Sequence, residues 1–364
     1  MNEQAEARRI ARERAILEAV LQGQLDPVLA VDQDLVILFA NRSMARLAGA
    51  EGSAELIGRQ AGDVLESSSL LALLRRGVES RRPTAGTYEV TREQHRTYQV
   101  TVTPLEVEVH GVRGAVAVLH DQTALRRLER IRSDFIANVS HELRTPLTAV
   151  HGFIETLQNG SYKNPERLKR YLAIMHGETT RVIALINDLL HLSSLESPDK
   201  VLNLERVDMR ELAASVVELY RRPAETKGIA LSIKAPRSLP RVMADPALIR
   251  QALLNLVDNA VKYTEPGGSV TVGVERDEGG VRVIVTDTGV GIPPDSLDRV
   301  FERFYRVDKA RSRKEGGTGL GLSIVKHTIE KHQGRLGIAS TPGQGTTIWF
   351  SLPLSQRNPH VAAK

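Results

Sequence analysis

The sequence predicts an α+β chain of several domains: a mixed α/β domain, a central antiparallel helical hairpin and a C-terminal α/β sandwich. Three observations favour this order. Short β-rich runs enclose small helical patterns in residues 15–122, an unbroken helical pattern begins at Thr123, and helices alternate with strands in residues 198–354. The 364 residues are enough for roughly two or three separate cores.

The composition is that of a soluble globular protein. Hydrophobic residues make up 41% of the chain and charged residues 26%. The sequence has no cysteine, which excludes a disulfide framework, a thiolate metal site and a flavin photo-adduct. Basic and acidic residues are interspersed despite the net charge of +5, so we interpret them as a solvated surface and expect no direct contact with nucleic acid.

The sequence shows neither a membrane helix nor a signal peptide. No run approaches the roughly 18 apolar residues that a spanning helix needs, and the N-terminus lacks an apolar stretch. We therefore expect no transmembrane segment in this chain and a cytoplasmic location. The chain is then either a soluble protein or the cytoplasmic part of a membrane-associated one.

An amphipathic helix is predicted over residues 3–24, where Ile10, Leu17, Val20 and Leu21 lie among charged residues. It is either a coiled-coil lead-in or a flanking helix.

The next segment alternates strands with small helices. Strands are predicted at PVLAVD, LVILFAN, GTYEV, RTYQVTVTP and GAVAVLHD, and helices near residues 43–49 and 69–78. This order resembles a PAS sensor domain, which either binds a small ligand or only dimerises and relays. We interpret His95, in a turn at TREQH, and His110, near another turn, as surface histidines rather than haem ligands.

Two helices follow and should form an antiparallel hairpin. The stretch NGSYKNP at residues 159–165 breaks them apart. Apolar seams are predicted at Val139, Leu143, Val150, Phe153 and Leu157 of the first helix and at Leu168, Leu172, Met175, Thr179, Val182, Ile186 and Leu189 of the second. A hairpin cannot bury such a stripe alone, so we expect a homodimer in which two hairpins form a four-helix bundle.

His141 lies off the first seam. It is two residues from both Val139 and Leu143, about 200° round the helix, and should face solvent. Its face also carries Asp134, Arg144, Thr145 and Thr148, and Glu142 lies alongside. A neutral imidazole is a nucleophile near neutral pH, and a neighbouring carboxylate can hold one ring N–H. Pro146 removes one backbone hydrogen bond and should loosen the helix at Glu142.

The remaining chain predicts an α/β sandwich with one mixed sheet. Helices are predicted at residues 209–221, 245–263 and 321–332, and strands at IALSIK, SVTVGVE, GVRVIVTD, RLGIAS and TTIWFSLP. In the second helix, Asn255, Asn259 and Lys262 project from one face, a set that suits Mg²⁺ and phosphates. SSLESPDK, residues 193–200, reads as a linker before this domain.

Two glycine-containing segments complete the candidate site. The strand GVRVIVTD ends at Asp287, followed by Gly289 and Gly291, where a carboxylate can accept a hydrogen bond from an exocyclic amine. Glycines from Gly316 to Gly321 precede a helix, whose N–H groups suit a triphosphate, although no Walker lysine follows. A further glycine-containing turn lies at Gly343 to Thr346. A plain hairpin turn explains it nearly as well as a role in the candidate site does.

The string F-x-x-x-x-S-H-E-L-R-T-P-L around His141 resembles the phosphoacceptor motif of sensor histidine kinases. Three further motifs of that family follow in order: N-L-x-D-N-A-x-K-Y, D-T-G-V-G-I and G-G-T-G-L-G-L. The resemblance covers about residues 120–354, and the sensor with its soluble body resembles phosphate-regulon-type kinases. It implies a lead-in at residues 1–14, a PAS-like domain at 15–122, a phosphotransfer hairpin at 123–197, an ATP-binding domain at 198–354 and a tail at 355–364.

The resemblance also implies roles for the site residues. ATP and Mg²⁺ are the expected cofactors, with Asn259 on Mg²⁺, Lys262 on phosphate, Tyr263 near the adenine and Asp287 on its amino group. The other expected ATP-site residues are Asn255, Gly289, Gly291, Gly317, Thr318, Gly319, Leu320, Gly321 and Thr346. Residues 292–315 resemble a mobile lid, docked by Phe301 and Phe304, with Arg306 on the γ-phosphate.

The implied function is autophosphorylation of His141, with Glu142 orienting or deprotonating the imidazole, and transfer to an aspartate on a response regulator receiver domain. Thr145 matches the position of a phosphatase residue in the family. One alternative is an ATP-driven conformational machine, which would lack the His141 motif. Another is a non-catalytic dimeric scaffold, which would have no use for Asn259, Lys262 and Asp287 together.

Overall fold

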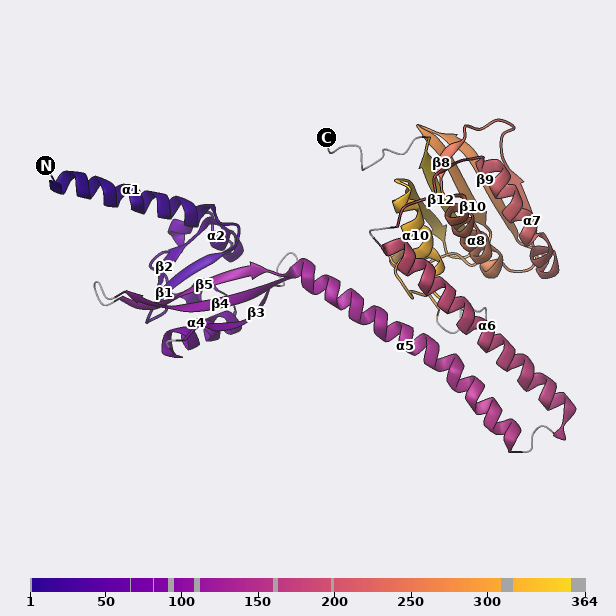
Figure 1. Ribbon diagram of the computed structural model, residues 1–364, viewed down its shortest axis with the longest axis horizontal. Helices are drawn as coiled ribbons and strands as arrows, with labels where there is room; N and C mark the ends of the chain where they lie inside the picture. Colours follow the sequence, from indigo (N-terminus) through magenta and orange to yellow (C-terminus); the bar gives the residue numbers. More distant parts are fainter. Residues whose placement is uncertain are drawn as a thin grey trace. The chain divides into compact units, whose positions relative to one another are not determined.

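The computed structural model describes residues 2–65, 67–80, 82–90, 95–107, 112–159, 163–197, 200–308 and 317–354. The chain divides into two compact units, Met1–Asp134 and Phe135–Lys364 (Figure 1), and each is described by itself.

The N-terminal unit is built on one antiparallel sheet in the order β2-β1-β5-β4-β3. Its strands are β1 (Val28–Asp32), β2 (Ile37–Ala40), β3 (Thr84–Val90), β4 (Arg96–Val107) and β5 (Val112–Asp121). Helices α1 (Asn2–Gly23), α2 (Arg42–Ala48), α3 (Ala61–Val64) and α4 (Ser68–Ser80) accompany them. Leu29, Met44, Leu74, Val100 and Val102 are fully buried between sheet and helices. Each strand and helix predicted for this segment is confirmed, within a few residues of its expected bounds.

Asn41 shows how the sequence sets this packing locally. Its side-chain oxygen accepts hydrogen bonds from the backbone N–H of Met44 at 2.9 Å and of Val28 at 3.0 Å, and its amide donates to the carbonyl of Asp26 at 2.8 Å. One buried carboxamide thus caps α2 and fixes the start of β1. His95 is exposed 3.9 Å from Glu89, as a surface histidine would be, and His110 lies outside the described residues.

The central hairpin consists of α5 (Thr123–Gln158) and α6 (Pro165–Glu196). Asn164 caps α6 by accepting a hydrogen bond from the backbone N–H of Arg167. Helix α5 continues through Pro146 without a break, although the proline removes the N–H that would bond the carbonyl of Glu142. The predicted loosening at Glu142 therefore does not interrupt the helix.

The C-terminal sandwich contains a mixed five-stranded sheet in the order β11-β12-β10-β9-β7, in which only β7 and β9 are parallel. The strands are β7 (Ala230–Lys234), β9 (Ser269–Asp277), β10 (Gly280–Asp287), β11 (Arg335–Thr341) and β12 (Gly345–Pro353). Helices α7 (Met209–Lys227), α8 (Pro246–Tyr263) and α10 (Gly321–Lys331) pack beside it (Figure 1). Val270, Val283 and Phe350 are fully buried in the shared core.

In the sandwich, the end of one helix differs from the prediction and one small sheet was not predicted. Helix α7 continues past the expected end at residue 221, includes Pro223, and stops only at Gly228, whose φ of 73° lies in the left-handed region. The small sheet of β6 (Glu205–Val207) and β8 (Val242–Ala244) was not predicted, because three residues are too few for a periodic pattern. Across the part of the chain that the structure describes, no helix is both long and apolar enough to span a bilayer.

Candidate functional site

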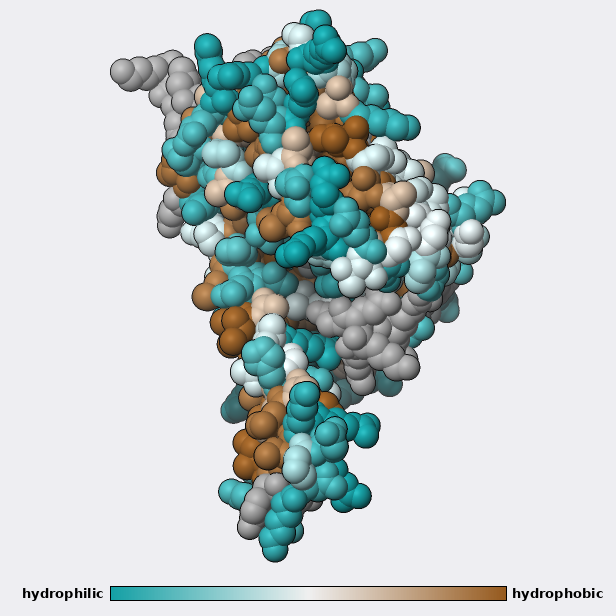
Figure 2. Space-filling model, turned by 90° about the vertical axis from the view of Figure 1, so that its right-hand side faces the viewer, coloured by the Kyte–Doolittle hydropathy of each residue, from teal (hydrophilic) through white to brown (hydrophobic). Residues whose placement is uncertain are grey.

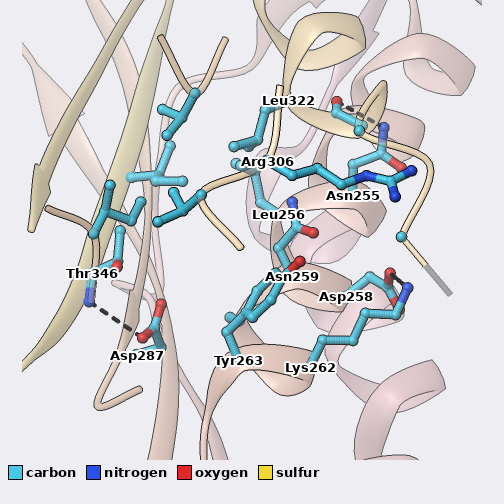
Figure 3. Close-up of a pocket in the computed structure, with 18 of the residues that line it drawn as sticks. Asn255, Leu256, Asp258, Asn259, Lys262, Tyr263, Asp287, Arg306, Leu322 and Thr346 are labelled. Carbon is cyan, nitrogen blue, oxygen red and sulfur yellow. Dashed lines mark hydrogen bonds and ion pairs between the residues drawn. The ribbon is translucent and has the colours of Figure 1, made fainter. Parts of the chain in front are cut away.

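A cavity of about 510 Å³ lies in the sandwich beside α8, the ends of β10 and β12, and the segment before α10 (Figure 3). Every residue that the sequence assigned to nucleotide binding lines it, except Gly289 and Leu320. Leu320 instead is fully buried against Leu185 and Leu192 of α6, and so its side chain fastens the sandwich to the hairpin. The predicted residues are thus brought together from five separate segments: α8, the end of β10, Arg306, the glycine-rich segment before α10, and Thr346 of β12.

Helix α8 presents Asn255, Asn259 and Lys262 toward this cavity, as their spacing predicted. Asn255 is already engaged: its amide donates to the carbonyl of Gly321 at 3.2 Å and its oxygen accepts from Gln251 at 3.2 Å. This residue therefore ties α8 to the start of α10. Asn259 lies between Asn255 and Tyr263 in Figure 3 and lines the cavity, where its carboxamide oxygen is a suitable ligand for a hard cation.

Lys262 is held by an acidic neighbour one helical turn away. Its ammonium lies 2.6 Å from Asp258, which also accepts a hydrogen bond from the hydroxyl of Tyr220 at 3.1 Å. Burial, followed by the charge of Asp258, raises the pKa of Tyr220, so this hydroxyl stays protonated and donates. The amine that was predicted to contact phosphate is consequently partly neutralised in this structure.

Asp287 ends β10 with its carboxylate in the cavity. Its Oδ1 accepts backbone hydrogen bonds from Gly289 at 2.8 Å and from Thr346 at 3.2 Å. Burial raises the pKa of Asp287, and these two hydrogen bonds counter the shift by stabilising the charged form. Both bonds are made to one oxygen of the carboxylate, so the group is fixed in the wall of the cavity with its other oxygen available as an acceptor (Figure 3).

Two glycines beside Asp287 are required by close backbone contacts. A Cβ atom on Gly289 would lie 2.4 Å from the carbonyl oxygen of Tyr263. A Cβ on Gly345, whose φ is 111°, would clash with the carbonyl of Asp287 itself. These contacts hold the end of α8 and the turn before β12 against Asp287, so the glycines shape the wall of the cavity.

The glycine-rich segment before α10 forms another wall and touches the hairpin. Gly317, Thr318, Gly319 and Gly321 line the cavity, and Gly319 has a φ of 74°. The hydroxyl of Thr318 donates to Asp188 of α6 at 2.7 Å. Burial raises the pKa of Asp188, and the bond from Thr318 counters that shift.

Arg306 joins the cavity to the phosphoacceptor candidate helix. Its guanidinium lines the cavity and donates to the carboxylate of Glu142 at 2.9 Å, and its side chain is only 5% exposed. Among the described residues, its buried Nε has no hydrogen-bond partner. The guanidinium therefore faces the cavity as a cationic group while it is bound to Glu142.

His141 is exposed on α5, as its position off the apolar seam predicted. The hydroxyl of Thr145, one turn later, donates to the carbonyl of His141 at 3.1 Å. Phe304, with a φ of 62°, packs its ring 5.8 Å from that of Phe135 on α5. The predicted docking by Phe304 thus involves the hairpin. The basic RSRK run of the lid lies outside the described residues.

Sequence reasoning overlooked several residues of this site: Arg181, Asp188, Tyr220 and Asp258. Asp258 carried a usable signal, because it lies four residues before Lys262 on a helix. Asp188 and Arg181 carried no signal in the sequence, because their partners are distant along the chain. Asp188 bonds Thr318, 130 residues away, and Arg181 bonds Glu142, 39 residues away.

Comparison with protein-family models gives three matches in chain order. A model described as the PAS fold matches residues 21–127, one described as the His Kinase A (phospho-acceptor) domain matches residues 131–198, and one described as the histidine kinase-, DNA gyrase B- and HSP90-like ATPase matches residues 244–356. The ATPase model implies ATP binding by the sandwich.

Curated relatives match the same region. The sensor protein kinase WalK of Staphylococcus aureus strain MRSA252 is 38% identical over 267 residues, which is 73% of this chain and 44% of that protein. A second Staphylococcus aureus WalK sequence is 38% identical over 267 residues, and 64% of it is covered. This chain therefore spans only 44% to 64% of the length of these relatives.

A solved structure has a similar fold. The histidine kinase ThkA, determined in complex with the response regulator protein TrrA, aligns with a TM-score of 0.52 and 24% identity. The alignment covers 93% of this chain and 98% of that chain. At this identity the similarity shows the fold alone.

Proposed function

Because this chain belongs to the sensor histidine kinase family, we propose that it transfers the γ-phosphoryl group of ATP to His141 and then to an aspartate of a response regulator. One observation carries the proposal most directly. Arg306 lines the nucleotide-sized cavity and binds Glu142, the residue that follows His141. A single side chain therefore links the site expected to bind ATP with the helix expected to receive the phosphoryl group.

The groups around the cavity fit ATP. Asp287 has one carboxylate oxygen oriented by two backbone bonds, which suits recognition of an exocyclic amine, and Gly289 and Gly345 keep the backbone close. The guanidinium of Arg306, which lines the cavity, and the N-terminus of α10 suit the phosphates. Asn259 would hold Mg²⁺ through its oxygen together with phosphate oxygens, and that ion would neutralise triphosphate charge.

In the proposed reaction, one nitrogen of His141 attacks the γ-phosphorus while the bond to the oxygen bridging to the β-phosphate breaks, and ADP leaves. Glu142 accepts a hydrogen bond from the other ring N–H, which keeps the attacking nitrogen unprotonated. The phosphohistidine that results holds a reactive P–N bond, which an aspartate oxygen of the partner attacks in turn. The product is an aspartyl phosphate and a free His141.

The response regulator is proposed as the partner by analogy with ThkA, whose structure includes the response regulator protein TrrA. Thr145 is proposed to act in the reverse direction, by orienting a water for removal of phosphate from that partner. Its hydroxyl, 3.1 Å from the carbonyl of His141, lies one helical turn from the phosphorylated side chain.

The hairpin is proposed to pair with a second copy of the chain. Large apolar side chains remain exposed along it in this structure (Figure 2). They include Ile136, Leu147, Ile154, Leu172, Ile183, Ile186 and Leu190. A four-helix bundle would bury this stripe, and the phospho-acceptor domain model over residues 131–198 supports it. We also propose the domain bounds given above; the three family models match in the same order along the chain, at residues 21–127, 131–198 and 244–356.

The experiment that tests this function is incubation of the purified chain with γ-labelled ATP and Mg²⁺. We expect acid-labile, alkali-stable label on the wild type, none on His141→Gln, and wild-type labelling on the control His151→Gln, an exposed histidine of the same helix. ATP turnover without any labelled protein would favour the ATP-driven machine, and label that persists in His141→Gln would exclude His141 as the acceptor.

A further inference from the structure

The carboxylate of Glu142 is held by two arginines. Its Oε2 accepts a hydrogen bond from Arg306 at 2.9 Å and another from Arg181 at 3.2 Å. The arginine side chains are 5% and 12% exposed, and that of Glu142 is 23% exposed. Because both pairs are largely shielded from water, these charged hydrogen bonds restrict the carboxylate more than surface ion pairs would.

The two arginines belong to different structural elements. Arg181 lies on α6 and Glu142 on α5, so their contact is internal to the hairpin. Arg306 follows β10 in the sandwich, so it moves with the sandwich. If the sandwich shifts along the hairpin to bring a γ-phosphate to His141, Arg306 is carried with it, whereas Arg181 keeps its position beside Glu142.

Arg306 also faces the cavity that is proposed to bind the nucleotide. Its guanidinium lines the cavity, and its Nε is without a hydrogen-bond partner among the described residues. A triphosphate carries more negative charge than one carboxylate, so bound nucleotide competes with Glu142 for this arginine. Once Arg306 binds the nucleotide instead of Glu142, Glu142 keeps only its contact with Arg181, and this contact then orients its carboxylate.

We propose that Arg181 is a positioning residue for phosphorylation of His141: it holds the Glu142 carboxylate in place when Arg306 is released to the nucleotide. This inference rests on the proposed function. Glutamate has several rotatable bonds, and on an exposed helix face it would sample many orientations. The contact with Arg181 fixes the carboxylate from the side of α6, so Glu142 keeps one orientation while it performs its proposed role toward His141, the preceding residue.

The test compares initial rates of His141 labelling at varied ATP for the wild type, Arg181→Gln and Arg181→Lys. Arg181→Gln should lower kcat by about 10- to 100-fold, the usual cost of a misplaced catalytic group, and leave the KM for ATP within about twofold. Arg181→Lys keeps a cation and should recover part of that loss. Arg170→Gln, which removes an exposed arginine of the same helix, should label at the wild-type rate.

A double variant separates positioning from a structural role. In a Glu142→Gln background, the further change Arg181→Gln should alter kcat by less than about twofold, because the carboxylate on which Arg181 acts is already absent. If Arg181 acted only by stabilising the fold, independently of Glu142, the change Arg181→Gln would lower kcat by the same factor in the wild type and in Glu142→Gln. Thermal melting of each variant identifies any loss of rate that comes from unfolding, and Arg181→Lys carries the test if Arg181→Gln does not fold.

The outcomes distinguish this inference from the function beneath it. Labelled wild type together with an unchanged kcat in Arg181→Gln would overturn the positioning role and leave the kinase proposal intact. A raised KM with unchanged kcat would also overturn it, since that result places Arg181 in nucleotide binding. Wild type that acquires no label on His141 would overturn both proposals.

Discussion

The sandwich buries its large apolar side chains, whereas the hairpin leaves many of its own exposed. In the sandwich, Val270, Val283 and Phe350 are fully buried in a core shared by the sheet and the helices. In the hairpin, Leu190 is 63% exposed and Ile136 56%, and buried α6 residues such as Leu192 pack against the sandwich. The sandwich supplies its own core, whereas the hairpin depends on surfaces outside itself. Substitutions in the sandwich should therefore mainly change the stability of the fold, and substitutions in the hairpin should mainly change assembly of the dimer.

The largest effect should follow removal of a core side chain from the sandwich. Phe350→Ala should lower the free energy of unfolding by about 3 to 5 kcal/mol, because it leaves a cavity among residues that cannot collapse freely. Chemical denaturation followed by circular dichroism measures the change. Phe301→Ala, at a partly exposed position, is the matched control and should cost less. Equal losses in both variants would contradict the contrast between core and surface.

A smaller effect is expected from a charge on the hairpin stripe. Leu190→Glu should leave unfolding of the sandwich unchanged and raise the dissociation constant of the dimer by about tenfold or more, because a carboxylate would be buried in the bundle. Sedimentation or light scattering at several concentrations measures it. Asn187→Glu adds the same charge at an exposed polar position and should have a weaker effect. A dimer unaffected by Leu190→Glu would mean that this stripe is covered by something else.

A still smaller effect is expected on the pH dependence of stability, and it should arise from one buried histidine of the sandwich, His332. His332 is fully buried; its Nε2 accepts from the backbone N–H of Asp245 at 2.9 Å, and its Nδ1 lies 2.7 Å from the carbonyl of Thr328. Burial lowers the pKa of His332, only partly offset by the hydrogen bond to Thr328 and the charge of Asp245. The neutral ring is therefore the folded form.

Because the folded pKa of His332 is depressed, the unfolded chain binds a proton below about pH 6.5 that the folded chain does not. Stability should fall by about 1.4 kcal/mol per pH unit from that point down to the folded pKa, and this term should be absent at higher pH. Melting of the wild type and His332→Gln between neutral and mildly acidic pH measures it. The exposed His176→Gln is the control, and a wild-type slope that survives in His332→Gln would assign it to another group.

The sequence by itself determined most elements and the residue types of the candidate site. Periodic apolar residues were enough for the long helices and strands, because one buried face repeats along each of them. His141 could be placed on a solvent-facing side and Asn259 beside Lys262 on one helix face, because helical geometry relates residues three and four apart. Short elements such as β6 escaped, since three residues carry no period.

Only the tertiary structure decided which of these residues meet. The contacts of Glu142 with Arg306 and of Thr318 with Asp188 join residues 164 and 130 positions apart, and no spacing rule connects such positions. The same holds for Arg181, an ordinary surface arginine in the sequence that becomes nearly buried once α6 lies against α5. Local periodicity arises from backbone geometry, whereas ion pairs across elements arise from how the packed faces approach, which depends on the whole chain.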